Sequence, residues 1–355
     1  MTLQDLGYND YFQKLRLDNN LEGFGIGRVI AEHKERYIVK NEKGEFEAEI
    51  TGNLRFSAKS RKDFPAVGDW VSLINYEPNF AIIHSILPRL SMLSRQAVNK
   101  FGELQIIASN IDYGLIVQSV NRDFSINRLE RYLTLCYSSN IEPIIVITKT
   151  DLTDEHNLND LLNKIKVRVE SVPLIHVSNK TKVGIDKLKK LLYKGKTYCL
   201  LGSSGVGKSS LINNLIGGSR MKTAAISESI DRGKHVTTHR ELIPMINGAI
   251  LIDNPGMREV GITDGVLGIE STFEKIYDFA QNCKFSDCTH TSESDCAVQL
   301  AIDNGQIEIS HFENFMKMER EKEHYESTVA EKRRKDKDFG KMIKSFKKTK
   351  KQNKY

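Results

Sequence analysis

The 355-residue sequence lacks any long apolar run and contains little cysteine, proline or tryptophan. Without a stretch of about eighteen consecutive apolar residues, it does not predict a membrane-spanning helix. The polar start MTLQDLGYNDYF has no apolar segment of the signal-peptide type, so we expect a cytoplasmic protein without a membrane partner. Five cysteines, an odd number, argue against the disulfide framework of a secreted protein.

The positive charge is concentrated at the end of the sequence. The chain as a whole carries +6, with 52 Lys and Arg against 46 Asp and Glu. Residues 331–355 alone contain 12 Lys and Arg and 3 Asp and Glu, a net +9, so the preceding residues carry −3. A basic tail on a mildly acidic body favours a polyanionic partner, either nucleic acid or a membrane. A solvated tail without a partner has the same charge pattern.

Residues 24–90 predict a small all-β domain. Short apolar runs such as RYIVKN, VGDWVSLINY and NFAIIHSIL are separated by turn residues, with no helical pattern between them. Four or five such strands favour a barrel of the oligonucleotide-binding (OB) type, although a β-domain without a ligand has the same pattern. A basic loop contains Lys59, Arg61 and Lys62, which form either a solvated turn or contacts to phosphate.

From residue 111 the pattern changes to alternating strands and helices. The strand-like runs YGLIVQSV, EPIIVITK, PLIHVSN and KTYCLLG alternate with the helical runs INRLERYLTLCYSS, LNDLLNKIKVRV and IDKLKKLLYKG. This alternation predicts a parallel sheet with helices on both faces. ELIPMI and GAILIDN predict a hairpin through Asn-Gly. Residues 217–238 are polar and aperiodic, which is typical of a functional or disordered loop.

The stretch GSSGVGKSS matches the phosphate-binding loop pattern G-x-x-x-x-G-K-[ST]. A strand-like run precedes it and a helical run follows it, as the motif requires. Its glycines allow backbone N–H groups to surround phosphates at the positive end of a helix. We expect Lys208 to reach the β- and γ-phosphates and Ser209 to bind Mg²⁺. The predicted nucleotide-binding residues here are Gly202, Ser203, Ser204, Gly205, Val206, Gly207, Lys208, Ser209 and Ser210.

Three further motifs at predicted strand ends complete a guanine-nucleotide site. In TKTD, Asp151 can accept both the N1–H and the exocyclic amine of guanine, and adenine has no such donor pair, which argues against an ATPase or kinase. VSNKTKVG can contact the base from the other side, and DNPG places a carboxylate near Mg²⁺ and an N–H near the γ-phosphate. The corresponding predicted residues are Thr148, Lys149, Thr150, Asp151, Ser178, Asn179, Asp253 and Gly256.

The stretch CKFSDCTHTSESDC places three cysteines and one histidine within fourteen residues. Three thiolates and one imidazole are a donor set for a closed, structural zinc site, here Cys283, Cys288, His290 and Cys296. Buried core cysteines are the alternative, but Lys, Ser, Asp and Thr surround these positions. The remaining Cys136 and Cys199 lie in apolar segments and are expected to be core residues.

The motifs occur in a rotated order, because the two base motifs precede the phosphate loop. A rotated chain can form the same sheet, since the termini of a domain often lie close together at its surface. The order resembles that of the circularly permuted GTPases. With a small barrel before it and a Cys/His cluster after it, residues 20–330 resemble the RsgA family of small ribosomal subunit biogenesis GTPases.

The resemblance implies a cytoplasmic GTPase that acts in late assembly of the small (30S) ribosomal subunit. It would bind the subunit and its rRNA and hydrolyse GTP to GDP and phosphate in a subunit-stimulated reaction. The expected cofactors are one structural Zn²⁺ per chain and Mg²⁺ with GTP, and we expect a monomer. An RNA-binding assembly factor that senses GTP or GDP with little turnover is the alternative.

The implied fold is α/β and has four parts. These are an N-terminal region with an OB-like barrel over residues 1–90, a circularly permuted P-loop GTPase domain over 91–265, a zinc-binding helical domain over 266–330 and a basic tail over 331–355.

The base and switch motifs depart from the family pattern at two places. The base motif often begins with Asn in the family, whereas Thr148 stands here without that amide, which raises the question of weaker nucleotide binding. The switch motif typically reads GRHTTT, and this chain has GKHVTT. Either Thr237 or Thr238 is therefore the expected ligand for Mg²⁺ and the γ-phosphate.

The residue after DNPG does not supply the group that would orient the attacking water. Many GTPases have a water-orienting Gln there, but this chain has Met257, and a thioether cannot orient water by a strong hydrogen bond. His235 in the switch loop is the candidate catalytic residue, acting with the switch threonine. An exposed loop histidine without a catalytic role is the alternative.

Overall fold

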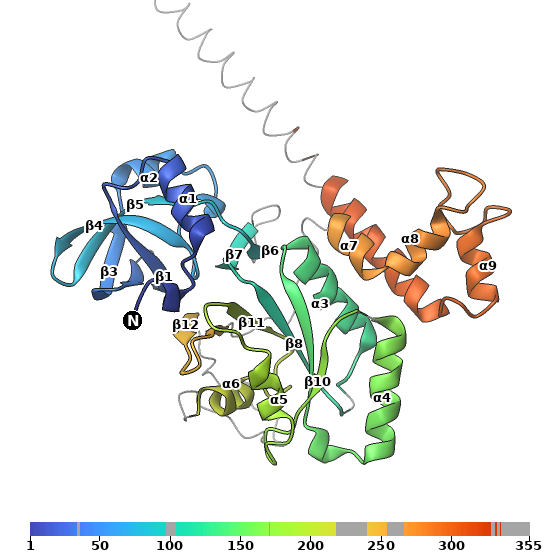
Figure 1. Cartoon of the computed structure of the whole chain (residues 1–355). Coiled ribbons are helices and arrows are strands. Elements are labelled where there is room, and N and C mark those ends of the chain that lie inside the picture. The colour runs from blue at the N-terminus through green and yellow to red at the C-terminus, as the bar shows by residue number, and fades with distance from the viewer. Residues whose placement is uncertain are drawn as a thin grey trace, which may run out of the picture.

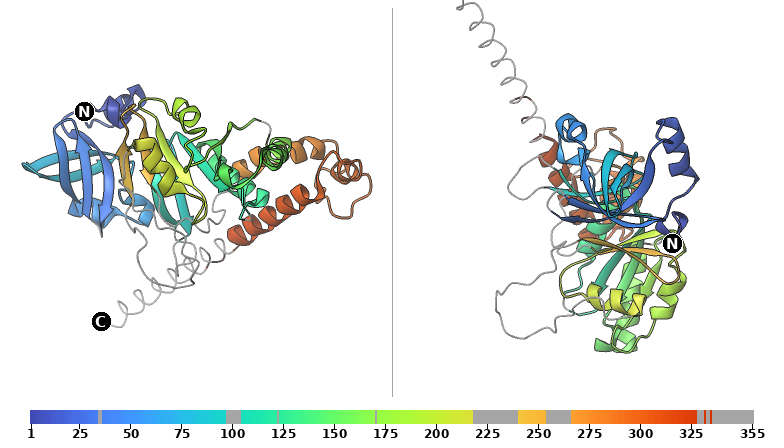
Figure 2. Two further views of the ribbon diagram at one scale, coloured as in Figure 1. Left: turned by 90° about the horizontal axis from the view of Figure 1, so that it is seen from below. Right: turned by 90° about the vertical axis from the view of Figure 1, so that its left-hand side faces the viewer.

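A computed structural model describes most of the chain. The described residues are 1–33, 36–96, 104–121, 123–169, 171–217, 240–253, 266–327, 331 and 334. Three parts lie in a row, with a β-barrel and a helical C-terminal region on either side of a central α/β part (Figures 1 and 2). Within the described ranges, every helix is too short or too polar to cross a membrane.

The N-terminal barrel closes on itself through five strands. They are β1 (Gly25–His33), β2 (Arg36–Asn41), β3 (Gly44–Ile50), β4 (Trp70–Glu77) and β5 (Phe80–Ile86). The strand order is β1-β2-β3-β5-β4, and an additional pairing of β1 with β4 closes the ring. Alternate side chains point inward and fill the interior, among them Val29, Val39, Leu73 and Ile83. The barrel predicted from the sequence is therefore confirmed.

Helices in and before the barrel were not predicted. The short α2 (Gly52–Ser57) follows β3, and Thr51 caps it by accepting a hydrogen bond from the N–H of Leu54. Before the barrel, η1 (Gln4–Leu6) and α1 (Asp10–Asp18) form a small apolar cluster with Trp70. A further turn, η2 (Arg61–Asp63), lies in the basic loop.

The central part is a mostly parallel sheet covered by helices. Its strands are β8 (Tyr113–Ser119), β9 (Glu142–Thr148), β10 (Leu174–His176), β11 (Thr197–Leu201), β12 (Glu241–Pro244) and β13 (Ile250–Asp253), in the order β10-β9-β8-β11-β13-β12. Only β12 runs antiparallel to its neighbour among these strands, which confirms the predicted hairpin with β13. The helices are α3 (Ile126–Ser138), α4 (Glu155–Arg168), α5 (Ile185–Lys190) and α6 (Lys208–Ile216).

The barrel and the central sheet are joined by backbone pairing. Ala31 of β1 is paired with Glu241 of β12, so the two sheets form one eleven-stranded sheet. A separate hairpin of β6 (Met92–Gln96) and β7 (Leu104–Ser109) lies between the two parts (Figure 1). The sequence pattern predicted neither feature.

The C-terminal region is helical and packs on α3 of the central part. It comprises α7 (Val266–Thr272), α8 (Glu274–Ala280), α9 (Ala297–Asp303) and a helix over residues 309–327. A buried ionic cluster fixes its position, because Glu130 of α3 accepts hydrogen bonds from Arg168 and Asn314 and contacts His311 at 2.8 Å. Removing one partner from such a cluster leaves a buried charge, which is strongly destabilising.

Candidate nucleotide site and metal centre

The phosphate-loop motif turns tightly between β11 and α6. Gly202 and Gly207 have φ values of 149° and 94°, which favour glycine. A Cβ on Gly202 would lie 2.3 Å from the carbonyl oxygen of Val117, so a larger residue does not fit. Ser203 is half-buried, whereas Ser204 and Gly205 at the tip of the loop are exposed. The chain thus forms an open loop at the carboxyl edge of the sheet.

The two predicted base motifs are hydrogen-bonded to this loop. The hydroxyl of Thr148, at the end of β9, donates to the carbonyl of Val206 at 2.6 Å and lies 3.2 Å from that of Gln118. The side-chain amide of Asn179 donates to the carbonyl of Gly207 at 3.0 Å. Motifs that are about thirty and sixty residues apart in the sequence therefore meet at one edge of the sheet.

Asp151 is the predicted guanine-binding carboxylate and is exposed beside this junction. The hydroxyl of Ser178 donates to its Oδ1 atom at 2.6 Å, and the N–H of Thr181 donates to the same hydroxyl at 3.0 Å. Lys149 has a positive φ of 59°, and Thr150 begins the short turn η3 (Thr150–Leu152). The carboxylate is consequently held by a hydroxyl that is itself fixed by the backbone.

Lys208 lies folded onto the phosphate loop. Its ammonium donates to the carbonyl oxygens of Gly202 and Ser203 at 2.7 and 2.6 Å. Burial lowers the pKa of Lys208 to about 8, an effect opposed by the carboxylate of Asp253. Burial likewise raises the pKa of Asp253, and Lys208 opposes that shift. A phosphate group would give this desolvated ammonium the counter-charge that the loop carbonyls supply only in part.

The first turn of α6 carries the two serines of the motif. Ser209 is exposed and Ser210 is half-buried, and both follow Lys208 directly. Hydroxyl and carboxylate oxygens are donors that suit Mg²⁺, so Ser209 and the buried Asp253 at the end of β13 fit the predicted Mg²⁺ role in their chemistry.

Two contacts of the site were not foreseen from the motifs. The guanidinium of Arg128, in the first turn of α3, donates to the hydroxyl of Ser203 at 3.1 Å. Asn214 of α6 donates to both the carbonyl and the side-chain oxygen of Asn179. Neither residue belongs to a motif, and the sequence contains no signal that would bring Arg128 to a loop 75 residues away.

Several predicted residues lie outside the described part of the chain. These are His235, Thr237 and Thr238 of the switch motif, Gly256 of DNPG and the neighbouring Met257. Their catalytic and phosphate-binding roles stay predictions.

The Cys/His cluster brings four potential metal ligands together in the C-terminal region. The donor atoms of Cys283, Cys288, His290 and Cys296 all lie within 4.8 Å of one another. The Sγ atoms of Cys283 and Cys296 are 3.8 Å apart, and His290 Nδ1 lies 3.6 and 3.4 Å from them. Tetrahedral zinc with bonds of about 2.3 Å to sulfur and 2.0–2.1 Å to nitrogen implies edges of roughly 3.8 and 3.6 Å. The arrangement fits a tetrahedral metal ion.

The loop that carries these ligands is fixed by its own hydrogen bonds. Glu293 accepts from the N–H groups of Thr289 and Thr291, and the hydrogen bond from the Thr289 hydroxyl is the main reason that the pKa of Glu293 falls to about 2. Gln299 donates its side-chain amide to the carbonyl of His290 and its N–H to Cys296 Sγ. Such outer contacts orient metal ligands. Cys136 and Cys199, by contrast, are fully buried in the central part, as predicted.

Comparisons with known proteins agree with this architecture. The RsgA GTPase family model matches residues 86–263, and a second family model, described as 50S ribosome-binding GTPase, matches residues 197–331. A small ribosomal subunit biogenesis GTPase RsgA 2 from Listeria monocytogenes is 42% identical over 322 residues, which cover 90% of this chain and 89% of that protein. The RsgA 2 protein of Lactiplantibacillus plantarum is 44% identical over 83% of each chain.

Solved structures show the same fold. YjeQ from Thermotoga maritima has a TM-score of 0.62 and 28% identity, with 82% of this chain and 96% of that chain covered. YloQ, described as a circularly permuted GTPase, has a TM-score of 0.60 at 24% identity, covers 85% and 96% of the two chains, and supports the fold alone. With its rotated motifs, barrel and Cys/His cluster, the chain belongs to the RsgA GTPase family and is a circularly permuted GTP hydrolase.

Proposed function

We propose that this GTPase acts in late maturation of the small ribosomal subunit and that its base motifs and phosphate loop form one guanine-nucleotide site. The observation that carries the site is the pair of hydrogen bonds from Thr148 and Asn179 to the phosphate loop. They hold the end of β9 and the segment after β10 against the loop that follows β11, so that base and phosphates of one nucleotide fall within reach of all three.

In this site, the carboxylate of Asp151 accepts the two donors of guanine while Ser178 holds its orientation. Lys208 leaves the carbonyls of Gly202 and Ser203 and binds the β- and γ-phosphates, with the loop N–H groups around them. Ser209 and Asp253 would supply oxygen atoms near a Mg²⁺ ion bound with GTP, and the ion would neutralise charge that develops on the phosphates.

The proposed partner is the small ribosomal subunit with its rRNA. Relatives that share 42–44% identity over most of the chain are named for biogenesis of that subunit. The net charge of +9 on residues 331–355 suits an rRNA surface, whose phosphates would bind these side chains with release of counterions. We further propose a cytoplasmic monomer.

The partner can be tested by co-sedimentation of the full chain with purified ribosomal subunits. With a non-hydrolysable GTP analogue we expect pelleting with the small subunit and not with the large one. Pelleting with the large subunit alone would favour the description 50S ribosome-binding GTPase, which matches residues 197–331. That outcome would refute the proposed partner.

For catalysis we propose that His235 orients the attacking water, with Thr237 or Thr238 bound to Mg²⁺ and the γ-phosphate. Met257 has no group that could replace the usual amide. His235→Ala should abolish most subunit-stimulated hydrolysis and leave GTP binding and subunit docking nearly unchanged. Lys208→Ala is the matched contrast, because it should impair nucleotide binding itself. Full stimulated turnover of the His235 variant would assign the water to another group.

For the metal centre we propose one structural Zn²⁺. Three thiolates and one imidazole leave no open position for a substrate, so the ion would stabilise the loop between α8 and α9 rather than take part in hydrolysis.

A further inference from the structure

A pocket lies at the junction of the barrel and the β6–β7 hairpin, away from the nucleotide motifs. Its volume is about 260 Å³, and its walls come from β1, the loop around η2 and β7. This volume is just below the range typical of sites for drug-sized molecules, so the pocket suits a group the size of one base rather than a whole nucleotide. The residues of the phosphate loop and of the base motifs do not line it.

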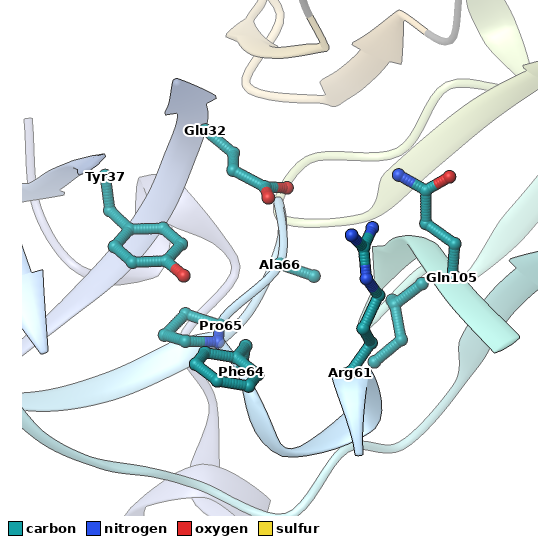
Figure 3. A pocket seen from close by; sticks show the side chains of 8 residues that line it. Glu32, Tyr37, Arg61, Phe64, Pro65, Ala66 and Gln105 are labelled. Atoms are coloured by element: carbon teal, nitrogen blue, oxygen red, sulfur yellow. The ribbon is translucent and has the colours of Figure 1, made fainter. Parts of the chain in front are cut away.

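Two opposite charges face this pocket without an ion pair between them. Figure 3 shows the carboxylate of Glu32, from β1, and the guanidinium of Arg61, from the turn η2, reaching into the same pocket. Among the described residues, neither side chain has a hydrogen bond or ion pair. Burial raises the pKa of Glu32, an effect that Arg240 and Arg61 oppose. A partly buried carboxylate without a donor is available to a ligand.

Hydrogen bonds hold the backbone of the loop that carries Arg61. A capping box formed by Ser60 and Asp63 fixes the turn that carries Arg61. Arg89 donates to the carbonyls of Lys62 and Phe64 at 2.7 and 2.8 Å, and thereby fixes the rest of this loop. The backbone of this wall is therefore preorganised, which lowers the entropy cost of binding.

Gln105 adds a third polar group to the pocket, and Phe64 and Pro65 give it an apolar wall. The oxygen of the Gln105 side chain accepts from Arg95, which leaves its amide N–H₂ as a donor beside Arg61 (Figure 3). Phe64 and Pro65 line the pocket with apolar surface. A ligand that matches these walls is flat, has a donor edge for Glu32 and has an acceptor edge for Arg61 and Gln105.

We propose that this pocket binds a guanine base. Guanine has two adjacent donors, N1–H and the 2-amino group, for the carboxylate of Glu32, and two adjacent acceptors, O6 and N7, for the guanidinium of Arg61. Adenine, cytosine and uracil do not combine such a donor pair with such an acceptor pair. Phe64 and Pro65 provide a surface for the ring. The base is part of either an RNA strand or a free guanine nucleotide, so the inference extends beyond the GTP site and does not depend on it.

The test uses the full chain loaded with GDP in the proposed nucleotide site and then freed of excess nucleotide, so that no free guanine competes for the pocket. Anisotropy of labelled pentaribonucleotides should give at least about tenfold tighter binding of UUGUU than of UUUUU or UUAUU. Inosine in place of guanine removes the 2-amino donor, and 7-deazaguanine removes N7, so each should weaken binding several-fold. These probes test both contacts on the unaltered protein. Equal affinity for all the oligonucleotides would overturn the proposal.

Matched variants separate base recognition from general charge. Glu32→Gln and Arg61→Gln should each abolish the preference for guanine. Lys59→Gln removes a charge from the same exposed loop and should weaken all oligonucleotides equally, and Glu47→Gln on the outer face of β3 should change nothing. A guanine preference retained by Glu32→Gln would refute the assignment. Competition between GMP and UUGUU distinguishes the source, since tighter binding of GMP indicates a free nucleotide and tighter binding of UUGUU indicates an RNA strand. Co-sedimentation with the small subunit reports on the proposed function separately.

Discussion

The hydrogen bond from Thr148 to the phosphate loop gives the sharpest test of the nucleotide site. Thr148 is fully buried, and its hydroxyl lies 2.6 Å from the carbonyl of Val206. Thr148→Val removes this hydroxyl at nearly constant shape. The carbonyl of Val206, on a residue that is itself 2% exposed, then loses a donor in a buried setting. Leaving a buried polar group unsatisfied costs about 1–3 kcal/mol.

This cost is expected to divide between folding and nucleotide binding. A loop that is no longer held against β9 must be ordered by the nucleotide, so we expect GTP affinity to fall by roughly 5- to 150-fold if most of the cost appears in binding. Urea unfolding of the nucleotide-free chain measures the part that appears in stability. Titration with a fluorescent guanine nucleotide measures the part that appears in binding.

Two matched variants decide whether the hydroxyl is responsible. Thr148→Ser keeps the donor and should bind nucleotide within about threefold of the parent, since only a methyl group is lost. Thr148→Asn introduces the amide that is common in the family and tests whether Thr148 weakens affinity. If Thr148→Val binds nucleotide as tightly as the parent and is equally stable, the reasoning is refuted. An equal loss in Thr148→Ser would assign the effect to packing.

Three other predictions address the base, the ammonium and the metal. Asp151→Asn should move nucleotide preference from guanine to xanthine, because the amide presents a donor where guanine also has one; competition between GTP and XTP measures this. The pKa of Lys208 is about 8 in the folded chain without nucleotide, against an ordinary value of 10.5. Between pH 8 and pH 10.5 the folded chain therefore binds fewer protons than the unfolded chain, and the free energy of unfolding should rise with pH in that range. GTP binding should then take up a proton above pH 8, and calorimetry in buffers of different ionisation enthalpy would detect it. Cys288→Ala should lower the zinc content from one ion per chain and the melting temperature with it, and metal analysis of the pure parent chain that finds no zinc would contradict this.

The sequence predicted the alternating strands and helices well because the apolar pattern continues without interruption through each segment. The strand YGLIVQSV and the helix INRLERYLTLCYSS became β8 and α3 with shifts of few residues. The Asn-Gly pair at 247 and 248 predicted the β12–β13 hairpin through turn chemistry, and Gly248 indeed has a positive φ of 81°. Each of these signals is local, so the remainder of the fold does not alter it.

Features set by tertiary pairing could not be predicted in this way. The helix α2 has six residues, fewer than two turns, and its sequence GNLRFS has no apolar repeat. The pairing of β1 with β12 joins residues about 210 positions apart and depends on the whole arrangement of both domains. The ionic cluster around Glu130 likewise assembles from α3, α4 and the helix over 309–327, and no spacing in the sequence relates these segments.

The candidate site was more predictable than its supporting contacts. Phosphates, guanine and tetrahedral metals each require particular atoms at fixed offsets along one loop, so Lys208, Asp151 and the Cys/His cluster stand out in the sequence. A supporting residue such as Arg128 only has to place a hydrogen-bond donor near Ser203, and many side chains on many elements could do so. The chemistry of a ligand constrains the residues that touch it far more than it constrains the residues behind them.

The rotated order also determines which part of the chain adjoins the barrel. In the permuted chain the phosphate loop leads into α6, then residues 218–239 and then β12, which forms backbone hydrogen bonds with β1 of the barrel. Arg240, directly before β12, donates to the carbonyl of Ile106, and Ile106 lines the pocket that holds Glu32 and Arg61. Only one sheet pairing therefore separates the barrel surface from the strand that follows the predicted switch motif. A ligand in that pocket would contact Ile106, whose carbonyl accepts the hydrogen bond from Arg240 at the start of β12. Such a ligand would therefore bear on the position of β12.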